Sequence, residues 1–168
     1  MKSKRKIFGA SAWALFSVFT IPDPQTGQTY LKRLRIIQTP WFSIYLHWIY
    51  LPDRDRDPHD HPWNFTSIIL RGGYTERVWP QVDGKRYTPQ TATGDRYTDV
   101  RIIWRRFSVH RMSTDNAHMI QTLKPKTLTL IVTGRRSRVW GFWTEDGFVP
   151  FDKYIEENKT HGPDPFMS

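Results

Sequence analysis

The stretch that decides the fold is 57–65, which reads Asp-Pro-His-Asp-His-Pro-Trp-Asn-Phe. Its two histidines, His59 and His61, are separated by one residue, and alternate side chains of an extended segment point to the same side. Both imidazoles can therefore reach one metal ion. The prolines on either side fix the backbone and limit the entropy that is lost on binding.

The chain that follows the pair predicts an antiparallel return to it. A strand-like run at 65–70 is followed by Gly72-Gly73-Tyr74, and further on the run 109–112 meets a turn at 113–117. His118 opens the next strand-like run. Because an antiparallel sheet can bring His118 beside the pair, the sequence predicts one metal site built from His59, His61 and His118.

The spacing of turn residues predicts an all-β fold. Turn signals recur about every 8–15 residues, which is the rhythm of a β-sandwich or β-barrel. Nothing suggests a βαβ alternation, a phosphate-binding loop or a nucleophile elbow. We expect a single domain over 1–168, an antiparallel β-barrel or jelly roll with few short helices and a core at about 28–150. Runs rich in β-branched and aromatic residues mark the strands, at 30–37, 42–50, 65–70, 74–79, 100–104, 109–112, 119–123, 127–133 and 139–143.

The two ends of the chain are expected to be peripheral. A basic segment at 2–6 precedes an apolar run at 7–21, which is read as a strand or short helix packed on the domain, with an export signal as the alternative. That reading predicts a cytoplasmic protein. One helix is expected at 151–158, where Asp152 can act as the cap, and the tail at 161–168 is expected to be loose.

Composition limits the chemistry. The 168 residues include no cysteine, so disulfides, thiolate zinc sites and a cysteine nucleophile are excluded, and a metal must be held by His, Asp or Glu. The formal net charge is +9, which favours anionic partners. The basic residues are scattered along the chain, so we expect a small-molecule substrate or ligand, neutral or anionic, with nucleic acid as the alternative and no membrane partner.

At this point the sequence resembles the cupin superfamily, whose first motif has His-x-His and a later glycine, and whose second motif has a third histidine. His59, His61 and Gly72 or Gly73 match the first motif, and His118 matches the third histidine. The resemblance covers about 30–145. It is closest to small cupin-like proteins of phage and actinobacterial genomes, which share the His-Asp-His-Pro-Trp stretch and a late segment, here 140–144, that reads Trp-Gly-Phe-Trp-Thr.

The sequence also departs from the family pattern. The position of the usual glutamate falls on Phe65 or Thr66, and the usual Pro-x-Gly turn is replaced by Ser113-Thr114-Asp115. The resemblance therefore implies a site of three histidines without a carboxylate. Neutral imidazoles suit a divalent transition metal, here Fe, Zn, Ni or Cu. Three protein ligands leave positions open for water, substrate or oxygen.

Other residues are candidates for the surroundings of the site. His47 is read as a hydrogen-bonded core residue or a substrate group, and His110 as a further ligand. Glu76 is either a displaced carboxylate or a solvent-facing residue, and Asp60 is a turn residue or salt-bridge partner. The aromatic residues expected to line a pocket, unless they only pack in the core, are Trp63, Tyr74 and Trp140.

Three functions are consistent with these features. The favoured one is a metal-dependent, oxygenase-like enzyme that acts on a small molecule. The second is a sugar or sugar-nucleotide isomerase or epimerase, with His59 or His118 as the base and Tyr74 as the acid. The third is a non-catalytic protein that binds a ligand or nucleic acid. A homodimer is compatible with all three.

Overall fold

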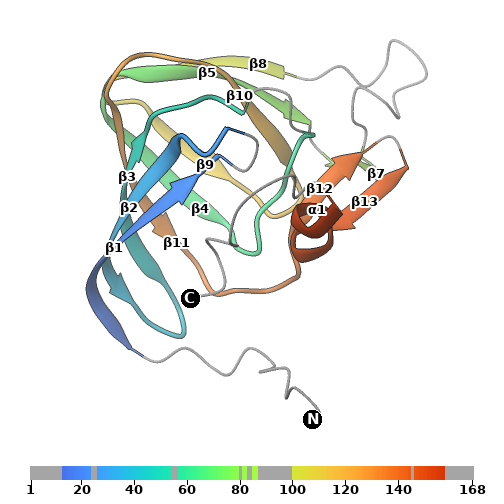
Figure 1. Cartoon of the computed structure of the whole chain (residues 1–168), viewed down its shortest axis with the longest axis horizontal. Coiled ribbons are helices and arrows are strands. Elements are labelled where there is room, and N and C mark those ends of the chain that lie inside the picture. The colour runs from blue at the N-terminus through green and yellow to red at the C-terminus, as the bar shows by residue number, and fades with distance from the viewer. Residues whose placement is uncertain are drawn as a thin grey trace.

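A computed structural model of the chain describes residues 13–23, 26–53, 57–79, 81–82, 85–86, 100–144 and 146–157. The basic segment 2–6 and the tail 161–168 lie outside these residues. The described part is built from β-strands and one short helix (Figure 1). Its elements are β1 (Ala14–Pro22), β2 (Thr29–Gln38), β3 (Ser43–Ile49), β4 (Phe65–Arg71), β5 (Gly73–Trp79), β6 (Gln81–Val82), β7 (Lys85–Arg86), β8 (Val100–Arg105), β9 (Val109–Met112), β10 (Ala117–Leu123), β11 (Thr127–Thr133), β12 (Gly141–Thr144), β13 (Gly147–Pro150) and α1 (Phe151–Glu157).

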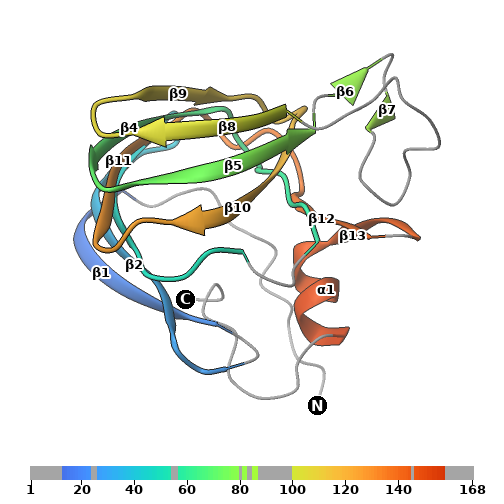
Figure 2. The same cartoon turned by 90° about the horizontal axis from the view of Figure 1, so that it is seen from above.

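Two antiparallel sheets form the body of the molecule. A six-stranded sheet has the order β1-β2-β3-β11-β4-β9, and a three-stranded sheet has the order β10-β5-β8. The first four strands all lie in the six-stranded sheet, and the chain then crosses between the two sheets from β4 to β5, from β8 to β9, from β9 to β10 and from β10 to β11. Figure 2 shows the two sheets facing each other, with β12, β13 and α1 at one end. The predicted all-β, antiparallel jelly-roll architecture is confirmed.

The core lies between the two sheets. Ile49 and Ile69 from the six-stranded sheet pack with Tyr74 and Ile120 from the three-stranded sheet. In β3 and β11 buried residues alternate with more exposed ones, as expected for strands with one face toward the core. The inner face therefore carries both this apolar cluster and the polar side chains that form the candidate site.

The apolar run near the N-terminus contributes a strand to the main sheet. Its described part is β1, which pairs with β2, and Ile21 joins the core cluster. The predicted helix is present as α1 and packs on β12 and β13. Among the described residues, no helix has the length and the apolar character needed to cross a membrane.

Candidate metal centre

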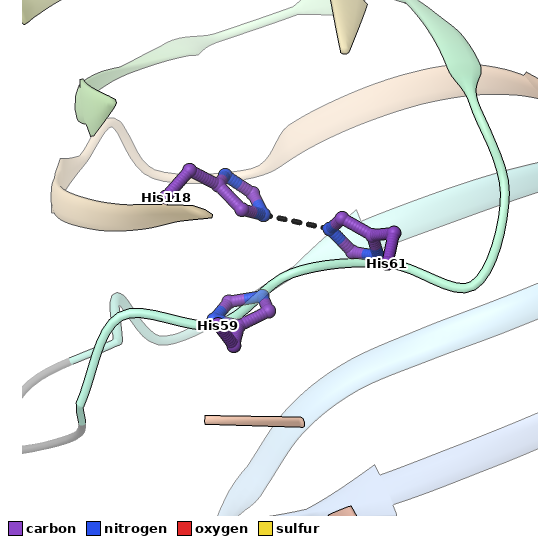
Figure 3. Close-up of side chains that lie close together, drawn as sticks. All are labelled: His59, His61 and His118. Atoms are coloured by element: carbon purple, nitrogen blue, oxygen red, sulfur yellow. Dashed lines mark hydrogen bonds between the residues drawn. The ribbon is translucent and has the colours of Figure 1, made fainter. Parts of the chain in front are cut away.

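The structure brings His59, His61 and His118 together. Each residue contributes one ring nitrogen to the cluster, and these three nitrogens all lie within 4.8 Å of one another. The Nε2 atoms of His61 and His118 are 2.7 Å apart, and the ring of His59 lies 4.5 Å from that of His118 between centroids (Figure 3). His118 is buried, whereas His59 and His61 are half-buried. His118 is therefore the most buried residue of the three.

Backbone hydrogen bonds hold the His-x-His segment beside β10. The His59 amide donates to the His118 carbonyl at 3.0 Å, and the His118 amide donates to the His59 carbonyl at 2.8 Å. On the other side, His59 forms a second antiparallel bridge with Phe142 of β12. The segment thus behaves as a short strand between β10 and β12, and this places its side chains at fixed positions.

Asp60 anchors the same segment from the opposite face. Its carboxylate is fully buried and accepts hydrogen bonds from the Gly141 amide at 3.0 Å and from the Trp143 indole at 3.2 Å. The Arg138 guanidinium lies 3.1 Å from the same carboxylate. The prediction of Asp60 as a salt-bridge partner is confirmed. Because Asp60 points away from the three imidazoles, it orients the pair without joining the donor set.

His118 is held from behind by Glu76. Its Nδ1 makes a short hydrogen bond with the Glu76 carboxylate, which is fully buried. The Trp104 indole donates to the other carboxylate oxygen at 2.7 Å, and His110 Nε2 lies 3.5 Å from it. A carboxylate on Nδ1 fixes the proton there and directs Nε2 toward the site, which is the arrangement often seen behind metal-bound histidines.

Burial and neighbouring charge set the pKa values of these groups. Burial lowers the pKa of His61 well below its ordinary value, and the neighbouring His118 and His59 lower it further. Burial also disfavours charge on His118, but the Glu76 carboxylate outweighs it and the pKa of His118 is raised. Burial would raise the pKa of Glu76, but His118 and its other partners lower it. His61 is therefore a neutral imidazole at neutral pH, as a metal ligand must be.

The donor set fits a divalent transition metal. With Nδ1 of His118 facing a carboxylate, the two Nε2 atoms of His61 and His118 point at each other, so a proton or a cation must lie between them. A tetrahedral ion with metal–nitrogen distances of about 2.0–2.1 Å needs ligand nitrogens about 3.3 Å apart. Small ring movements from the observed 2.7 Å would provide that separation.

Aromatic rings enclose the three imidazoles. Phe65 meets His61 edge-on at 4.8 Å, and Trp140 lies parallel to His61 at 6.3 Å, both between centroids. Trp140 in turn stacks on Phe151 at the start of α1. The short helix therefore supports one wall of the site. That Trp140 lines a pocket stays a prediction.

The other predicted residues lie farther out. His47 accepts a hydrogen bond from Arg33 at 2.9 Å, as expected for a core histidine. His110 is buried against Trp104 and Glu76 and is not among the three grouped nitrogen donors of the described residues. Tyr74 is a core residue whose hydroxyl lies 3.4 Å from His110 Nδ1, and burial raises its pKa. Trp63 is half-buried beside the pair in sequence.

Two features of the site depart from the interpretation of the sequence. Of the two alternatives for Glu76, the solvent-facing one is wrong, since Glu76 is fully buried behind His118. The signal was present, because Glu76 alternates with the apolar Tyr74 and Val78 on the inner face of β5. Trp104, which donates to Glu76, was not singled out. No local sequence signal links Trp104 to Glu76, because their contact depends on how β8 pairs with β5.

Comparison with known proteins supports the fold. No model of a protein family matches the chain, and no curated protein sequence matches it. Its structure is similar to a cupin 2 conserved barrel domain protein from Rhodopseudomonas palustris, with a TM-score of 0.51 and 12% identity over 82% of this chain and 89% of that one. This likeness shows that the chain has a cupin-type barrel.

Two further solved structures are similar at a lower level. One is hydroxypropylphosphonic acid epoxidase from S. wedmorenis, with a TM-score of 0.47 and 11% identity over 71% of this chain. The chain spans 55% of the length of that epoxidase. The other is KdgF from Halomonas sp., with a TM-score of 0.43 and 14% identity over 73% of this chain and 94% of that one.

Proposed function

We propose that the protein binds a divalent transition metal through His59, His61 and His118 and acts on a small molecule as an oxygenase-like enzyme. The observation that carries this proposal is the convergence of three imidazoles from two segments, with the Glu76 carboxylate behind His118. A histidine that only packs in a core has no need of two such neighbours. The His-Asp-His-Pro-Trp stretch is also our reason for proposing a relationship to small phage and actinobacterial cupin-like proteins.

The residues of the chain have separate tasks in this proposal. His59 and His61 supply two nitrogen ligands from a segment that Asp60 fixes, and His118 supplies the third. When bound, the metal would act as a Lewis acid or an oxygen-activating centre, with positions left open by its three protein ligands. Phe65 and Trp140 shield part of the site from water. This shielding strengthens electrostatic interactions within the site.

Metal content tests the ligand assignment. The full chain, purified without a histidine tag, should hold close to one equivalent of a transition metal by mass spectrometry, natively or after reconstitution. His59→Ala and His61→Ala should each lose this metal and stay folded, because the ligands sit on a preformed β-scaffold. His47→Ala is the matched control, since His47 is another half-buried imidazole outside the cluster. Full metal content in either ligand variant would end the assignment.

A second measurement separates an oxygenase from a metal-independent isomerase. Protein loaded with iron(II) under anaerobic conditions should bind nitric oxide and give the electron paramagnetic resonance signal of a high-spin iron–nitrosyl centre. That signal requires an open coordination position, which three protein ligands leave. Loaded protein that gives no such signal would contradict the oxygenase proposal while leaving metal binding intact.

A further inference from the structure

The inner face of β2 carries two arginines. Residues Leu31, Arg33 and Arg35 alternate on the side that faces the three-stranded sheet, and Leu31 belongs to the core cluster. Across the sheet, Arg33 lies opposite His47 and Arg35 opposite Tyr45 in the register with β3. Both arginines are half-buried. Charged side chains on the inside of a β-barrel are costly to keep there and call for a physical reason.

Neither arginine has a carboxylate partner in the described part of the chain. Arg33 donates to His47 and lies 5.1 Å from the Tyr45 ring, and Arg35 lies 4.6 Å from the Phe19 ring. The Nε of Arg35 is shielded from solvent and has no hydrogen-bond partner. Burial lowers the pKa of Arg33, and the charge of Arg35 lowers it further. A shielded, unpartnered Nε on Arg35 beside the guanidinium of Arg33 makes a site for an anion.

This arginine pair lies near the candidate metal centre. Leu31 of β2 and Ile120 of β10 pack in one core cluster, Arg33 follows Leu31 on the same face of β2, and His118 precedes Ile120 on the same face of β10. The arginines and His118 therefore face the same space between the two sheets. We propose that Arg33 and Arg35 bind a carboxylate or phosphate group of the small-molecule ligand and present the rest of that ligand to the three histidines. This inference rests on the proposed function, because it names the class of molecule on which the site acts. A guanidinium matches both anions through paired hydrogen bonds.

Anion-dependent stabilisation tests the pair. For the full chain as purified, inorganic phosphate at 50 mM should raise the thermal midpoint by roughly 3 °C relative to chloride at equal ionic strength, because a ligand that binds only the folded state stabilises it. Sodium acetate in a parallel series distinguishes a phosphate site from a carboxylate site. Arg33→Gln and Arg35→Gln should each lose most of this response. Arg111→Gln, which removes an exposed charge, should retain it.

The same samples separate this inference from the proposed function. Arg33→Gln should keep its metal content, and without phosphate it should be at least as stable as the parent, because an uncompensated cation is removed. An equal response to anions in all variants would overturn the arginine site. So would a response lost equally in Arg111→Gln. Loss of metal in His59→Ala tests the metal ligands only and does not affect the test of the arginine site.

An independent observation concerns the outer face of the six-stranded sheet. Side chains that point away from the core form rows across the strands, and the middle row is apolar on every strand. It consists of Val18, Leu34, Leu46, Leu130, Ile68 and Val109. The adjacent row is apolar over four strands, with Leu15, Ile37, Ile44 and Val132, before it ends in Thr66 and Arg111. An antiparallel sheet with one face in water normally has polar residues there.

The described part of the chain does not cover this face. Val18 is 68% exposed and Val109 is 55% exposed at the two ends of the middle row. The two apolar rows cross six strands about 4.8 Å apart and lie about 7 Å from each other, which gives a band of about 24 by 14 Å. With side-chain relief this band reaches the few hundred Å² of an apolar patch that marks a protein contact site.

We infer that this face docks a second copy of the chain, sheet against sheet. Two copies of a chain with a net charge of +9 repel each other, so they can only associate through a surface without charge. The two rows are such a surface, since their only charged residue is Arg111 at the rim. An anionic partner would instead need a surface rich in positive charge. Two such faces related by a two-fold axis are complementary, since each offers the same apolar rows to the other.

Sedimentation equilibrium of the full chain tests the interface. The expected mass is twice the 20.0 kDa of one chain. Leu46→Lys and Leu130→Lys should each raise the dissociation constant at least about thirtyfold, since both side chains lie in the middle row. Ile103→Lys, at a 61% exposed apolar position on β8, is the matched control and should stay dimeric. A monomeric parent, or variants that stay dimeric with a native circular dichroism spectrum, would overturn the inference.

Discussion

At the scale of single residues, His118 differs from the other two histidines of the site. Its Nδ1 faces Glu76 and its Nε2 faces His61, so both ring nitrogens are engaged. The carboxylate increases the electron density on the imidazole and fixes its tautomer. Glu76 itself is held by Trp104. Phe65 and Thr66 therefore supply no carboxylate to the three imidazoles, and the carboxylate nearest to them is that of Glu76, behind His118.

Glu76→Gln should weaken metal binding without removing a ligand. A glutamine keeps the size of the side chain but loses the charge, so affinity should fall about 10–100-fold. Competition with a chelator of known affinity measures this change. Asp53→Asn is the matched control, because Asp53 is an equally buried carboxylate that bonds Tyr30 and the Ile120 amide. Equal losses in both variants would mean that Glu76 acts only through folding.

The residues of the site were predictable to different degrees. His59 and His61 were identifiable because their spacing alone puts two imidazoles on one side of an extended segment. His118 required the antiparallel return of the chain, which the turn pattern indicated. The role of Glu76 could not be assigned, because its partners Trp104 and His118 come from β8 and β10. No local sequence pattern predicts the register in which these strands pair with β5.

At the scale of secondary-structure elements, the register of β5 and β10 sets the distance between Glu76 and His118. His118 pairs with Val78, and Glu76 pairs with Ile120, so the carboxylate and the imidazole are diagonal neighbours on one face. Diagonal neighbours in an antiparallel pair are within reach of long side chains. The turn between β4 and β5 therefore controls the site indirectly, because it fixes where β5 begins.

Gly73→Ala should damage this arrangement. Gly73 has a φ of 140°, which other residues rarely adopt, and an added Cβ would lie 2.3 Å from the Trp104 carbonyl oxygen. We expect a loss of about 2–4 kcal/mol in the free energy of unfolding, measured by chemical denaturation. Gly134→Ala is the control, because its Cβ would meet only the Asn64 carbonyl oxygen at 3.6 Å. Similar losses at both positions would contradict the steric argument.

Most strands were predictable because their periodicity is strong. The run Thr127–Thr133 was predicted with the boundaries that β11 has, and the run Val109–Met112 with those of β9. The role of β1 was less clear, since its exposed Leu15, Phe16 and Val18 give no alternation with polar residues. A strand that is apolar on both faces carries no pattern that shows which face is covered.

At the scale of the whole molecule, the inner space between the sheets combines an apolar cluster with a histidine-rich site. Several of these histidines are kept neutral by burial. Burial lowers the pKa of His61, His47 and His110, and in His47 and His61 nearby cationic groups add to the effect. His118 is the exception, because Glu76 raises its pKa despite burial. The stability of the metal-free fold must therefore depend on pH.

The metal-free protein should lose stability as the pH falls from 7.5 to 5. Unfolded histidines take up protons near pH 6.5, while His61, His47 and His110 resist protonation in the fold, so the unfolded state binds more protons below that pH. His118 acts in the opposite sense. Its contribution to the stability of the fold is fully present below about pH 6.5 and is lost as the pH rises through the raised pKa that His118 has in the folded state. Because three histidines lower the stability at acidic pH and only His118 raises it, the free energy of unfolding should fall by about 1 kcal/mol or more per pH unit.

Urea denaturation in the presence of a chelator, at pH values between 5 and 8, measures this slope. His47→Gln should make the slope shallower by roughly one proton, because it removes one of the three histidines that resist protonation. The lowered pKa of Glu76 adds stability that is lost only as the pH falls below its unfolded value of about 4.3, so it does not disturb this window. Stability that is constant, or that increases toward pH 5, would show that His118 and Glu76 outweigh the other histidines. In that case the site would be held together by its own buried ion pair before any metal binds.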